Sequence, residues 1–523
     1  MKKSFLIFLT SICVPTIYGQ TLSLPQLVEK IENSIFTVYA ENEKGNIFSQ
    51  GSGFVISRDG VCITNFHVLE NAYNGYVQNK DGEKFNITKV IDYNVDCDLV
   101  KFRIDNKGKQ FYALPLSMTK PQKGEEVVTL STPIGLEQTL SNGIVSSIRE
   151  SELYGTVIQM TAPISHGSSG SPILNRKGEV LGVSTFGVEG GQNLNFAVST
   201  LNFSKINKER NVNLQDITKD PLETPNIKKA RLAMLESNYE TAYELAMLEF
   251  EKDTTNHLAL FLLGNIYLDI EDYSSAIDIF IKAIELHTEK ADYFNFCGLA
   301  FRNYGDIEFN ANKDAGDMFM FALKSYDMAI SIERNPTYYF NKGNLIFNLF
   351  FSYKLLDKTS LYDAMNNFNV SIQLNPYSEE AYVHRAAVKN ELSDHWGAIS
   401  DCDKAIAINP SFYRSYFIRG DTKGYFLNDQ QAGIKDLEIA LSLVNTNKKD
   451  EKADILGLIG VQKIIWANNE IDKIKAQSLL NDAKKHFKEA FDISGKKIYL
   501  EKLNTIIYFE QRGEIPTIVQ PKK

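Results

Sequence analysis

The chain has 523 residues, of which 43% are hydrophobic and 23% charged, the balance of a globular protein with several domains. Its 56 basic and 65 acidic side chains give a net charge of −9, which disfavours a nucleic-acid binder because such proteins need a concentrated positive surface. Beyond the N-terminal segment no long apolar run without charge occurs, so the sequence predicts no integral membrane domain.

The N-terminus has the pattern of an export signal. Lys2 and Lys3 precede a short apolar run, and Gly19 supplies a small residue at a suitable cleavage point. We therefore interpret residues 1–19 as a cleaved signal peptide, which predicts a periplasmic or secreted protein. An uncleaved anchor is the alternative. Lipidation at Cys13 is disfavoured because the preceding residue is not small.

The remaining chain has two halves with different hydrophobic periods. Residues 20–204 contain short β-branched and aromatic runs separated by Gly, Asn and Asp, which predict an all-β sandwich or barrel. Residues 226–515 carry apolar side chains at i, i+3, i+4 and i+7, the period of amphipathic helices. The polar stretch 205–225, with Pro221 and Pro225, is predicted to be a linker between two domains.

The helical half repeats with a period of about 34 residues. Small residues at fixed positions allow two antiparallel helices to cross closely, and aromatic residues recur between them. One unit shows the pattern at Gly264, Tyr267, Ala276, Phe280 and Ala283. This spacing resembles the tetratricopeptide (TPR) repeat, in seven units from about residue 226 to 494. The resemblance implies an all-α solenoid whose concave groove binds a partner protein. An unrelated helical bundle is the alternative.

Two of these units contain insertions. The separation from Gly298 to Ala322, and that from Gly343 to Ala364, both exceed the separation from Gly264 to Ala276. The added residues are rich in Phe, Tyr, Asn and Lys. They predict either segments that emerge on one rim of the solenoid to contact a partner, or longer helices that widen the stack.

The β half carries three segments with residues suited to nucleophilic catalysis. They are Thr64-Asn-Phe-His-Val68, Asp98-Leu99 and Gly167-Ser-Ser-Gly-Ser171. A serine hydroxyl needs a base to take its proton, and an imidazole can do this when a carboxylate holds its other nitrogen. Glycines around the serine permit a tight turn whose backbone N–H groups converge on a developing oxyanion.

These motifs, in the order His, Asp, Ser, resemble the chymotrypsin-fold serine peptidases, most closely the HtrA/Deg branch. The resemblance implies a double β-barrel for the N-terminal domain. It also implies that His67 is the general base, Asp98 the residue that orients it and Ser169 the nucleophile. The backbone N–H groups of Gly167 and Ser169 would then form the oxyanion hole.

Several alternatives stay open at these positions. Asp96 competes with Asp98, although only the latter directly precedes an alternating strand, and Ser168 competes with Ser169 as the reactive hydroxyl. We expect His166 to be exposed or to line the entrance to the turn. Cys62 and Cys97 lie close in sequence to triad candidates, and whether they form a disulfide is undecided by the sequence.

The chain also departs from the families it resembles. The helical array stands where HtrA proteins carry a PDZ domain, so PDZ-based regulation is not carried over. Residues 181–187 lack the histidine that glutamate-specific relatives use, although by position Ser184, Thr185 and Phe186 are expected to bind substrate. No metal-ligand motif and no phosphate-binding loop occurs, so neither a metal nor another cofactor is expected.

Together these features predict an exported serine endopeptidase that acts on protein or peptide substrates and recruits a substrate or partner through its TPR array. A catalytically silent, protease-like scaffold is the alternative. The sequence decides neither the cleavage-site preference nor the oligomeric state.

Overall fold

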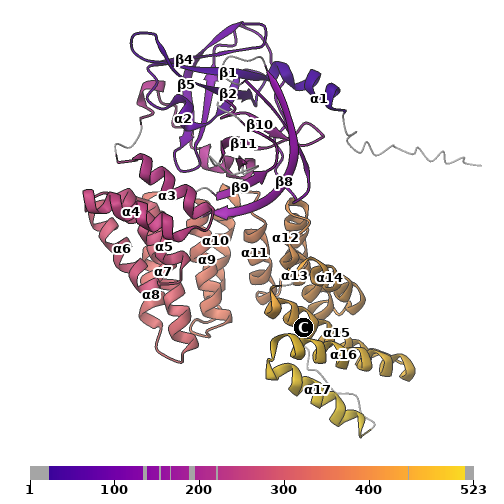
Figure 1. Ribbon diagram of the computed structural model, residues 1–523. Coiled ribbons are helices and arrows are strands. Elements are labelled where there is room, and N and C mark those ends of the chain that lie inside the picture. Colours follow the sequence, from indigo (N-terminus) through magenta and orange to yellow (C-terminus); the bar gives the residue numbers. More distant parts are fainter. Residues whose placement is uncertain are drawn as a thin grey trace, which may run out of the picture. The chain divides into compact units, whose positions relative to one another are not determined.

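The computed structural model describes residues 23–132, 138–151, 155–164, 167–187, 195–218, 222–445 and 447–512. The side chains of residues 150, 151, 186 and 187 are outside this description, and so is the predicted signal peptide. The chain divides into two compact units, residues 1–219 and 220–523 (Figure 1). The first unit is built from β-strands and the second from α-helices. The fold class predicted from the sequence is therefore confirmed.

After helix α1 (Leu24–Ile31) and the 3₁₀ helix η1 (Glu32–Ser34), the first unit forms a closed six-stranded antiparallel barrel in the order β1-β2-β3-β6-β5-β4. Its strands are β1 (Ile35–Glu41), β2 (Ile47–Val55), β3 (Val61–Thr64), β4 (Asn74–Gln78), β5 (Lys84–Asn94) and β6 (Leu99–Ile104). Between β3 and β4 lies the one-turn helix α2 (Phe66–Leu69). Closure through the β1–β4 pair leaves the barrel without an open sheet edge.

A second closed antiparallel barrel follows, in the order β10-β11-β12-β9-β8-β7. Its strands are β7 (Glu126–Ser131), β8 (Thr139–Ser151), β9 (Gly155–Met160), β10 (Pro172–Leu174), β11 (Val180–Gly187) and β12 (Asn195–Ser199). The two barrels share one hydrophobic core, because strand residues of both pack in a single cluster that includes Phe54, Leu99, Leu130 and Val183. This shared core fixes the position of one barrel relative to the other.

The first half of the predicted linker, residues 205–225, packs on the first barrel. After the 3₁₀ helix η2 (Thr200–Ile206), residues 207–217 run back over the first barrel, and we call them the connector. Leu214 and Ile217 are buried in the core of that barrel. The first unit therefore extends beyond the predicted domain end at residue 204.

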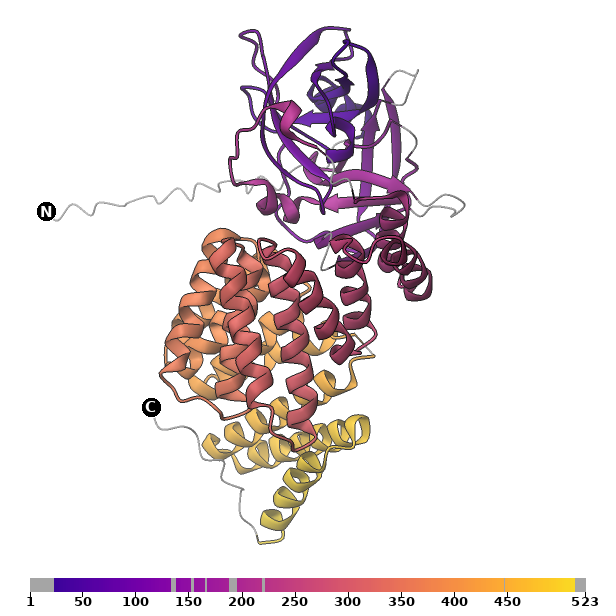
Figure 2. The same ribbon diagram turned by 90° about the vertical axis from the view of Figure 1, so that its left-hand side faces the viewer.

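The second unit is a solenoid of antiparallel helix pairs (Figures 1 and 2). The pairs are α3 (Pro225–Leu235) with α4 (Tyr239–Lys252), α5 (His257–Asp269) with α6 (Tyr273–Leu286), α7 (Ala291–Asn310) with α8 (Gly316–Ile332), α9 (Pro336–Phe351) with α10 (Ser360–Leu374), α11 (Glu379–Glu391) with α12 (His395–Ile408), α13 (Tyr413–Asp421) with α14 (Gln430–Leu443), and α15 (Lys449–Asn469) with α16 (Lys473–Ser494). A last helix, α17 (Lys497–Glu510), packs on α16. Within the described ranges no helix is long and apolar enough to cross a membrane.

In four of the pairs described, a glycine of the first helix lies against an aromatic ring of the second. A Cβ atom added at Gly264 would lie 2.6 Å from the ring of Phe280, and one at Gly298 would lie 2.8 Å from Tyr326. Atoms at these distances would clash, so the close crossing of the helices requires a residue without a side chain. This contact explains the spacing of small and aromatic residues on which the repeat assignment depends.

The two insertions lengthen helices rather than forming separate lobes. The first adds the end of α7, the loop of residues 311–315 and the start of α8. The second adds the end of α9, a loop at residues 352–359 and the start of α10. Of the two alternatives left open by the sequence, longer helices account for most of the added residues.

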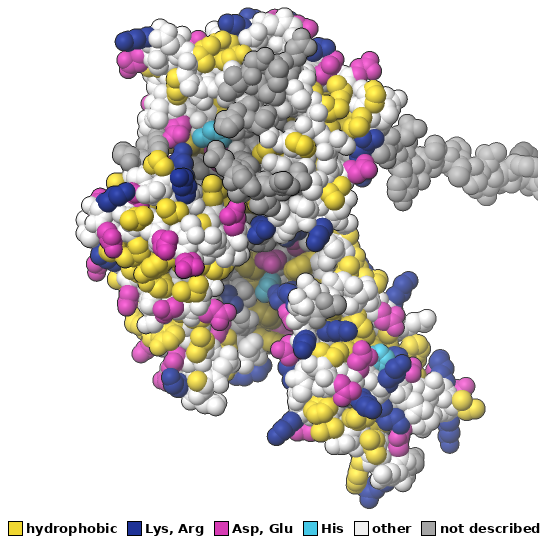
Figure 3. Space-filling view, viewed as in Figure 1, with side chains coloured by type: hydrophobic (Ala, Val, Ile, Leu, Met, Phe, Trp, Pro, Cys, Tyr) yellow, Lys and Arg dark blue, Asp and Glu magenta, His cyan; other side chains and the backbone are white. Residues whose placement is uncertain are grey.

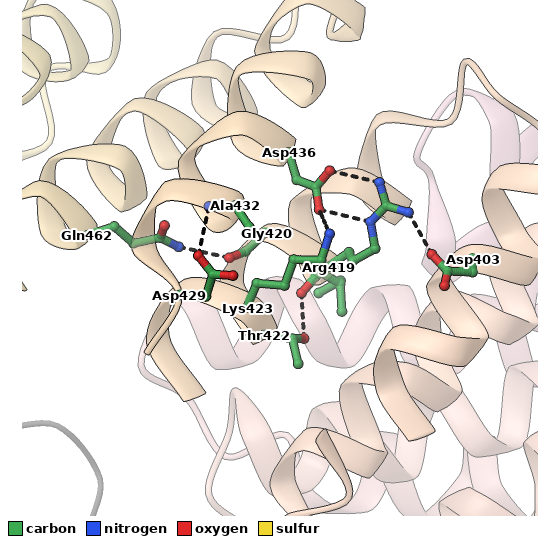
Figure 4. A network of polar contacts seen from close by, with 10 residues as sticks. Asp403, Arg419, Gly420, Thr422, Lys423, Asp429, Ala432, Asp436 and Gln462 are labelled. Atoms are coloured by element: carbon green, nitrogen blue, oxygen red, sulfur yellow. Dashed lines mark hydrogen bonds and ion pairs between the residues drawn. The ribbon is translucent and has the colours of Figure 1, made fainter. Parts of the chain in front are cut away.

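In two consecutive pairs, α11/α12 and α13/α14, ion pairs join the two helices in addition to their apolar contacts. The guanidinium of Arg419 donates to both carboxylate oxygens of Asp436 at 2.8 and 2.7 Å, and Lys423 Nζ lies 2.8 Å from the same carboxylate (Figure 4). Arg385 makes the equivalent bidentate pair with Asp401 at 2.8 and 2.7 Å. Such geometry gives directional contacts that fix how the two helices of a pair meet.

Candidate active site

His67 and Asp98 lie at the same end of neighbouring strands. Strands β3 and β6 pair with Thr64 opposite Val100, so the residues that follow β3 and precede β6 are adjacent. His67 Nδ1 lies 2.7 Å from Asp98 Oδ2, and the backbone N–H of His67 donates to Asp98 Oδ1 at 2.9 Å. Because a carboxylate accepts hydrogen bonds only, the short contact places the imidazole proton on Nδ1 and the lone pair on Nε2.

The backbone at Asp98 has an uncommon conformation. Its φ angle is +52°, in the left-handed region that aspartate adopts more readily than most residues. In this conformation the Asp98 carbonyl accepts a hydrogen bond from the backbone N–H of Phe66 at 3.1 Å. Both the side chain and the backbone of Asp98 therefore hold the segment that carries His67.

Asn65 connects this pair to the second barrel. It is fully buried, and its Nδ2 group donates to the Asp98 carbonyl at 2.9 Å and to Thr185 Oγ1 at 3.0 Å. Asp98 precedes a strand of the first barrel, whereas Thr185 lies on β11 of the second. One side-chain amide thus uses both of its N–H groups to join the two halves of the site.

Ser169 lies on a tight turn that requires glycine on both sides. Gly167 and Gly170 have φ angles of +92° and +87°. A Cβ atom at Gly170 would lie 2.0 Å from the Ser52 carbonyl oxygen, so no other residue fits there. Strand β2 holds the turn from the first barrel, because Ser52 N donates to the Ser169 carbonyl at 2.7 Å and Ser52 Oγ donates to the Gly167 carbonyl at 2.8 Å.

The Ser169 hydroxyl donates to the backbone carbonyl of Thr185 at 3.3 Å. Within the described part of the chain its hydrogen bond is thus made to β11 rather than to His67. The His67 side chain is 38% exposed and that of Asp98 16%, so solvent or a substrate reaches the imidazole while the carboxylate is mostly covered. Rotation about the Cα–Cβ bond of Ser169 is the movement that would redirect its hydroxyl.

The structure separates the competing candidates at these positions by their surroundings. Asp98, rather than the neighbouring Asp96, bonds to the His67 side chain. Ser168 is buried and its carbonyl accepts from Ser171 N at 3.0 Å, whereas Ser169 is partly exposed. His166 lies outside the described residues. The assignment of roles to these groups stays a prediction.

Cys62 and Cys97 are buried in different hydrophobic clusters, and no disulfide joins them. Burial raises the pKa of the Cys62 thiol.

Within the described residues no group of three His, Cys, Asp or Glu side chains is arranged to hold a metal ion.

The residues expected to bind substrate lie on β11. The Ser184 side chain is fully buried and Thr185 is 8% exposed, so neither side chain is directed to solvent. The backbone of Ser184 bonds to the turn, with its carbonyl accepting from Gly170 N at 2.8 Å and its N–H donating to Ser171 O at 2.8 Å. Phe186 pairs with Phe196 in the β11–β12 ladder, and its side chain is outside the description.

Sequence reasoning did not single out Asn65 or Ser52 as contributors, although both lie within quoted motifs. Their contacts cross between the two barrels, over separations of 120 residues for Asn65 with Thr185 and 115 for Ser52 with Gly167. A local pattern cannot show such pairings.

Comparison with known proteins places this site in a recognised domain. Residues 51–183 match the trypsin-like peptidase domain. The first unit is similar to HtrA proteases. Serine protease HTRA1 of Xenopus laevis is 34% identical over 159 residues, which cover 29% of this chain and 34% of that protein. The "Probable periplasmic serine endoprotease DegP-like" of Chlamydia trachomatis is 29% identical over 203 residues, covering 38% of this chain and 39% of that protein.

A solved serine endoprotease from Yersinia pestis is 26% identical, covers 35% of this chain and 65% of its own chain, and superposes with a TM-score of 0.32. The chain thus spans between a third and two fifths of the length of these two curated HtrA and DegP-like relatives. The similarity to HtrA proteins is to the peptidase part of this chain, and the helical unit lies outside the matched domain.

Proposed function

We propose that the protein is an exported serine endopeptidase that cleaves peptide bonds through an acyl-enzyme. The observation that carries the proposal is the 2.7 Å contact of His67 with Asp98, at a site where a Gly-Ser-Ser-Gly turn presents Ser169. The match of residues 51–183 to the trypsin-like peptidase domain supports it.

In the proposed reaction His67 acts first as a base. With the proton held on Nδ1 by Asp98, Nε2 accepts the Ser169 proton while the serine oxygen attacks the carbonyl carbon of the substrate. The imidazolium then carries a positive charge beside the Asp98 carboxylate, which stabilises it. His67 returns the proton to the leaving amine, and the acyl group stays on Ser169. Water, activated by the same imidazole, releases the acyl group.

The oxyanion of the intermediate needs backbone donors. We assign this role to the N–H groups of Gly167 and Ser169, since the positive φ angles of Gly167 and Gly170 produce a narrow turn at this point. Ser52 bonds to the Gly167 and Ser169 carbonyls and so holds the turn at two points, which supports a preorganised arrangement.

Substrate binding is assigned to the backbone of β11 rather than to its side chains. Ser184 and Thr185 have buried side chains, so an extended peptide would be held by main-chain hydrogen bonds at the strand's edge. Recognition of this kind is tolerant of sequence. It is suited to an endopeptidase that acts on unfolded protein segments.

A catalytically silent scaffold is the second candidate function, and one observation favours it. The Ser169 hydroxyl donates to the Thr185 carbonyl, an arrangement in which it does not transfer its proton to His67. If this rotamer persisted with substrate, the domain would bind peptides without cleaving them. The endopeptidase and the scaffold thus differ in whether the Ser169 side chain rotates toward His67 when substrate binds.

For the helical unit we propose recruitment of a partner or substrate protein by a TPR array. The first helices of successive pairs contact one another, α5 with α7, α7 with α9 and α9 with α11, and so form one continuous inner face. Figure 3 shows the helical unit hollowed on the face in view, with hydrophobic side chains among basic and acidic ones.

A fluorophosphonate probe tests the catalytic proposal, because it labels only a serine that a working triad has activated. We expect the purified mature protein to be labelled at Ser169 and to hydrolyse casein. A chain that folds, binds peptide and is never labelled would instead establish the scaffold.

A further inference from the structure

The connector is bonded along its length to strand β5 of the first barrel. Asn211 N donates to the Ile91 carbonyl at 2.9 Å, and Val90 N donates to the Val212 carbonyl at 3.0 Å. The side chain of Asn211 also accepts from Lys89 Nζ at 2.8 Å. These contacts make the connector an integral part of the barrel wall.

A buried charge anchors this segment. The Asp92 side chain is 0% exposed and lies 3.2 Å from Arg210 Nε. Its carboxylate also accepts from Lys208 N at 2.6 Å and from Tyr93 N at 3.0 Å. A carboxylate that loses all contact with water is tolerated only when such partners surround it.

From this anchor a chain of ring contacts leads to the catalytic histidine. The Arg210 guanidinium lies over the Tyr93 ring, 4.6 Å from its centre, and the Tyr93 ring packs on Phe66 at 5.6 Å. Phe66 immediately precedes His67, and its backbone N–H is bonded to the Asp98 carbonyl. Arg210 thus stands at the outer end of a stack whose inner end bears directly on the His67–Asp98 pair.

The C-terminal end of the connector supports helix α2, which carries His67. The Ile217 carbonyl accepts from Asn71 N at 3.0 Å, just beyond α2. Leu214 and Ile217 are buried together with Phe66, Val68 and Leu69 of α2. Since a four-residue helix has almost no stability of its own, its position depends on these neighbours.

We propose that the connector positions His67 for catalysis, with Arg210 as a positioning residue that acts through Tyr93 and Phe66. This inference depends on the proposed function, in which His67 is the base. The chain continues from Ile217 into the helical unit. The unit that would bind a partner is therefore covalently attached to the segment that supports the catalytic histidine.

The test compares variants of the full-length chain. Arg210→Ala should lower kcat per folded molecule on casein by about tenfold to a hundredfold, since a small displacement of a catalytic group has effects of this size, while KM changes little. The melting temperature should fall as well, because the buried Asp92 carboxylate loses a partner. Arg210→Lys, which keeps the charge beside Asp92, should restore part of the loss. A role in stability alone would instead lower the melting temperature and leave kcat per folded molecule unchanged.

Arg103→Ala is the matched control. Arg103 lies on the same barrel, its side chain is 35% exposed against 34% for Arg210, and it also pairs with an aspartate, Asp59 at 2.6 Å, although this carboxylate is exposed whereas Asp92 is buried. It makes no contact with the connector in the pairs described, so its replacement should leave kcat unchanged. If Arg210→Ala should fail to fold, Tyr93→Leu, which interrupts the ring stack but keeps apolar volume, should show the same loss in kcat.

Failure of the two proposals can be told apart. If the wild-type chain resists the fluorophosphonate probe, the proposed function fails. If the wild type is labelled and Arg210→Ala, or Tyr93→Leu in its place, retains full kcat, the positioning role is overturned. Equal losses in Arg210→Ala and Arg103→Ala would also overturn it, because the effect would then belong to the barrel surface in general.

Discussion

Asn65 and Thr185 join the two barrels by a single buried hydrogen bond of 3.0 Å. Through its second N–H group Asn65 holds the carbonyl of Asp98, and through its own carbonyl Thr185 holds the hydroxyl of Ser169. The acid and the nucleophile of the proposed triad are thus linked by two intervening residues on opposite barrels. Any change in the relative position of the barrels would act on this link.

Asn65→Ala should therefore lower kcat as well as stability. The substitution removes both hydrogen bonds, and the buried Thr185 hydroxyl left without a donor costs about 1–3 kcal/mol, whereas the Asp98 carbonyl keeps its bond from Phe66 N. We expect a loss of at least about tenfold in kcat, because Ser169 on the second barrel would no longer be aligned with His67 and Asp98 on the first. Asn74→Ala, at an exposed asparagine on the same barrel, is the control. Equal activity in the two variants would show that the link has no catalytic role.

Ser169→Ala should abolish probe labelling and peptide hydrolysis while the protein still folds, with a loss on the order of 10⁶ in turnover. The small, partly exposed side chain makes no contact that the fold requires beyond one hydrogen bond to Thr185. Mass spectrometry of the labelled peptide checks the site. Labelling that persists in Ser169→Ala and disappears in Ser168→Ala would identify the neighbouring hydroxyl as the nucleophile.

Asp98→Asn should reduce turnover by about 10⁴, because an amide facing Nδ1 can donate a hydrogen and so favours the wrong tautomer of the imidazole. Asp96→Asn serves as the control at the adjacent acidic position. Steady-state rates on a fluorogenic peptide measure both. A larger effect from Asp96→Asn would reverse the assignment of the orienting carboxylate.

The end point of a truncated protease should decide whether it works. A chain ending after residue 218 keeps Leu214 and Ile217 in the barrel core, whereas one ending after residue 204 loses them, at about 1.5–3 kcal/mol for each buried side chain. We expect the longer form to cleave casein and the shorter form to be unstable or inactive. Full activity of the shorter form at an unchanged melting temperature would show that the connector is dispensable.

The stability of the helical unit should respond to pH through Asp421. Burial, together with the nearby Glu391 carboxylate, raises the pKa of Asp421 to about 7. Between pH 4 and 7 the folded chain then binds a proton that the unfolded chain has lost, so this group's contribution to stability declines as pH rises through that interval. Asp421→Asn should raise the melting temperature at pH 8 more than at pH 5, as followed by circular dichroism. An equal rise in the melting temperature at pH 5 and pH 8 would contradict the raised pKa of Asp421.

Much of the architecture follows from local patterns in the sequence. Gly264 and Phe280 mark a helix pair because one residue without a side chain must face one large ring, and the same contact recurs in three other pairs. The contact between His67 and Asp98 is harder to anticipate from spacing alone. It arises because β3 and β6 are neighbours in a closed barrel, a property of the whole sheet order.

The connector shows why the rest could not be predicted. Its sequence is polar, and only Leu214 and Ile217 enter the core, which is too few apolar residues to give a periodic signal. Its main anchor joins Lys208 to Asp92, 116 positions earlier in the chain. A segment whose structure depends on such distant partners has the composition of a linker. The two insertions were ambiguous for a different reason, since Phe, Tyr, Asn and Lys are compatible with both loops and helices.

The lengthened helices α7 to α10 make the solenoid uneven. Each pair contacts only its neighbours, so the energy that holds the array together is distributed pair by pair along its axis. The central pairs bury rings such as Phe319 and Phe368 over a longer interface than the shorter pairs before them. Under tension or heat the shorter pairs α3 to α6 should therefore separate first, whereas the central pairs and the last pair, whose helices α15 and α16 have 21 and 22 residues, should stay ordered longer.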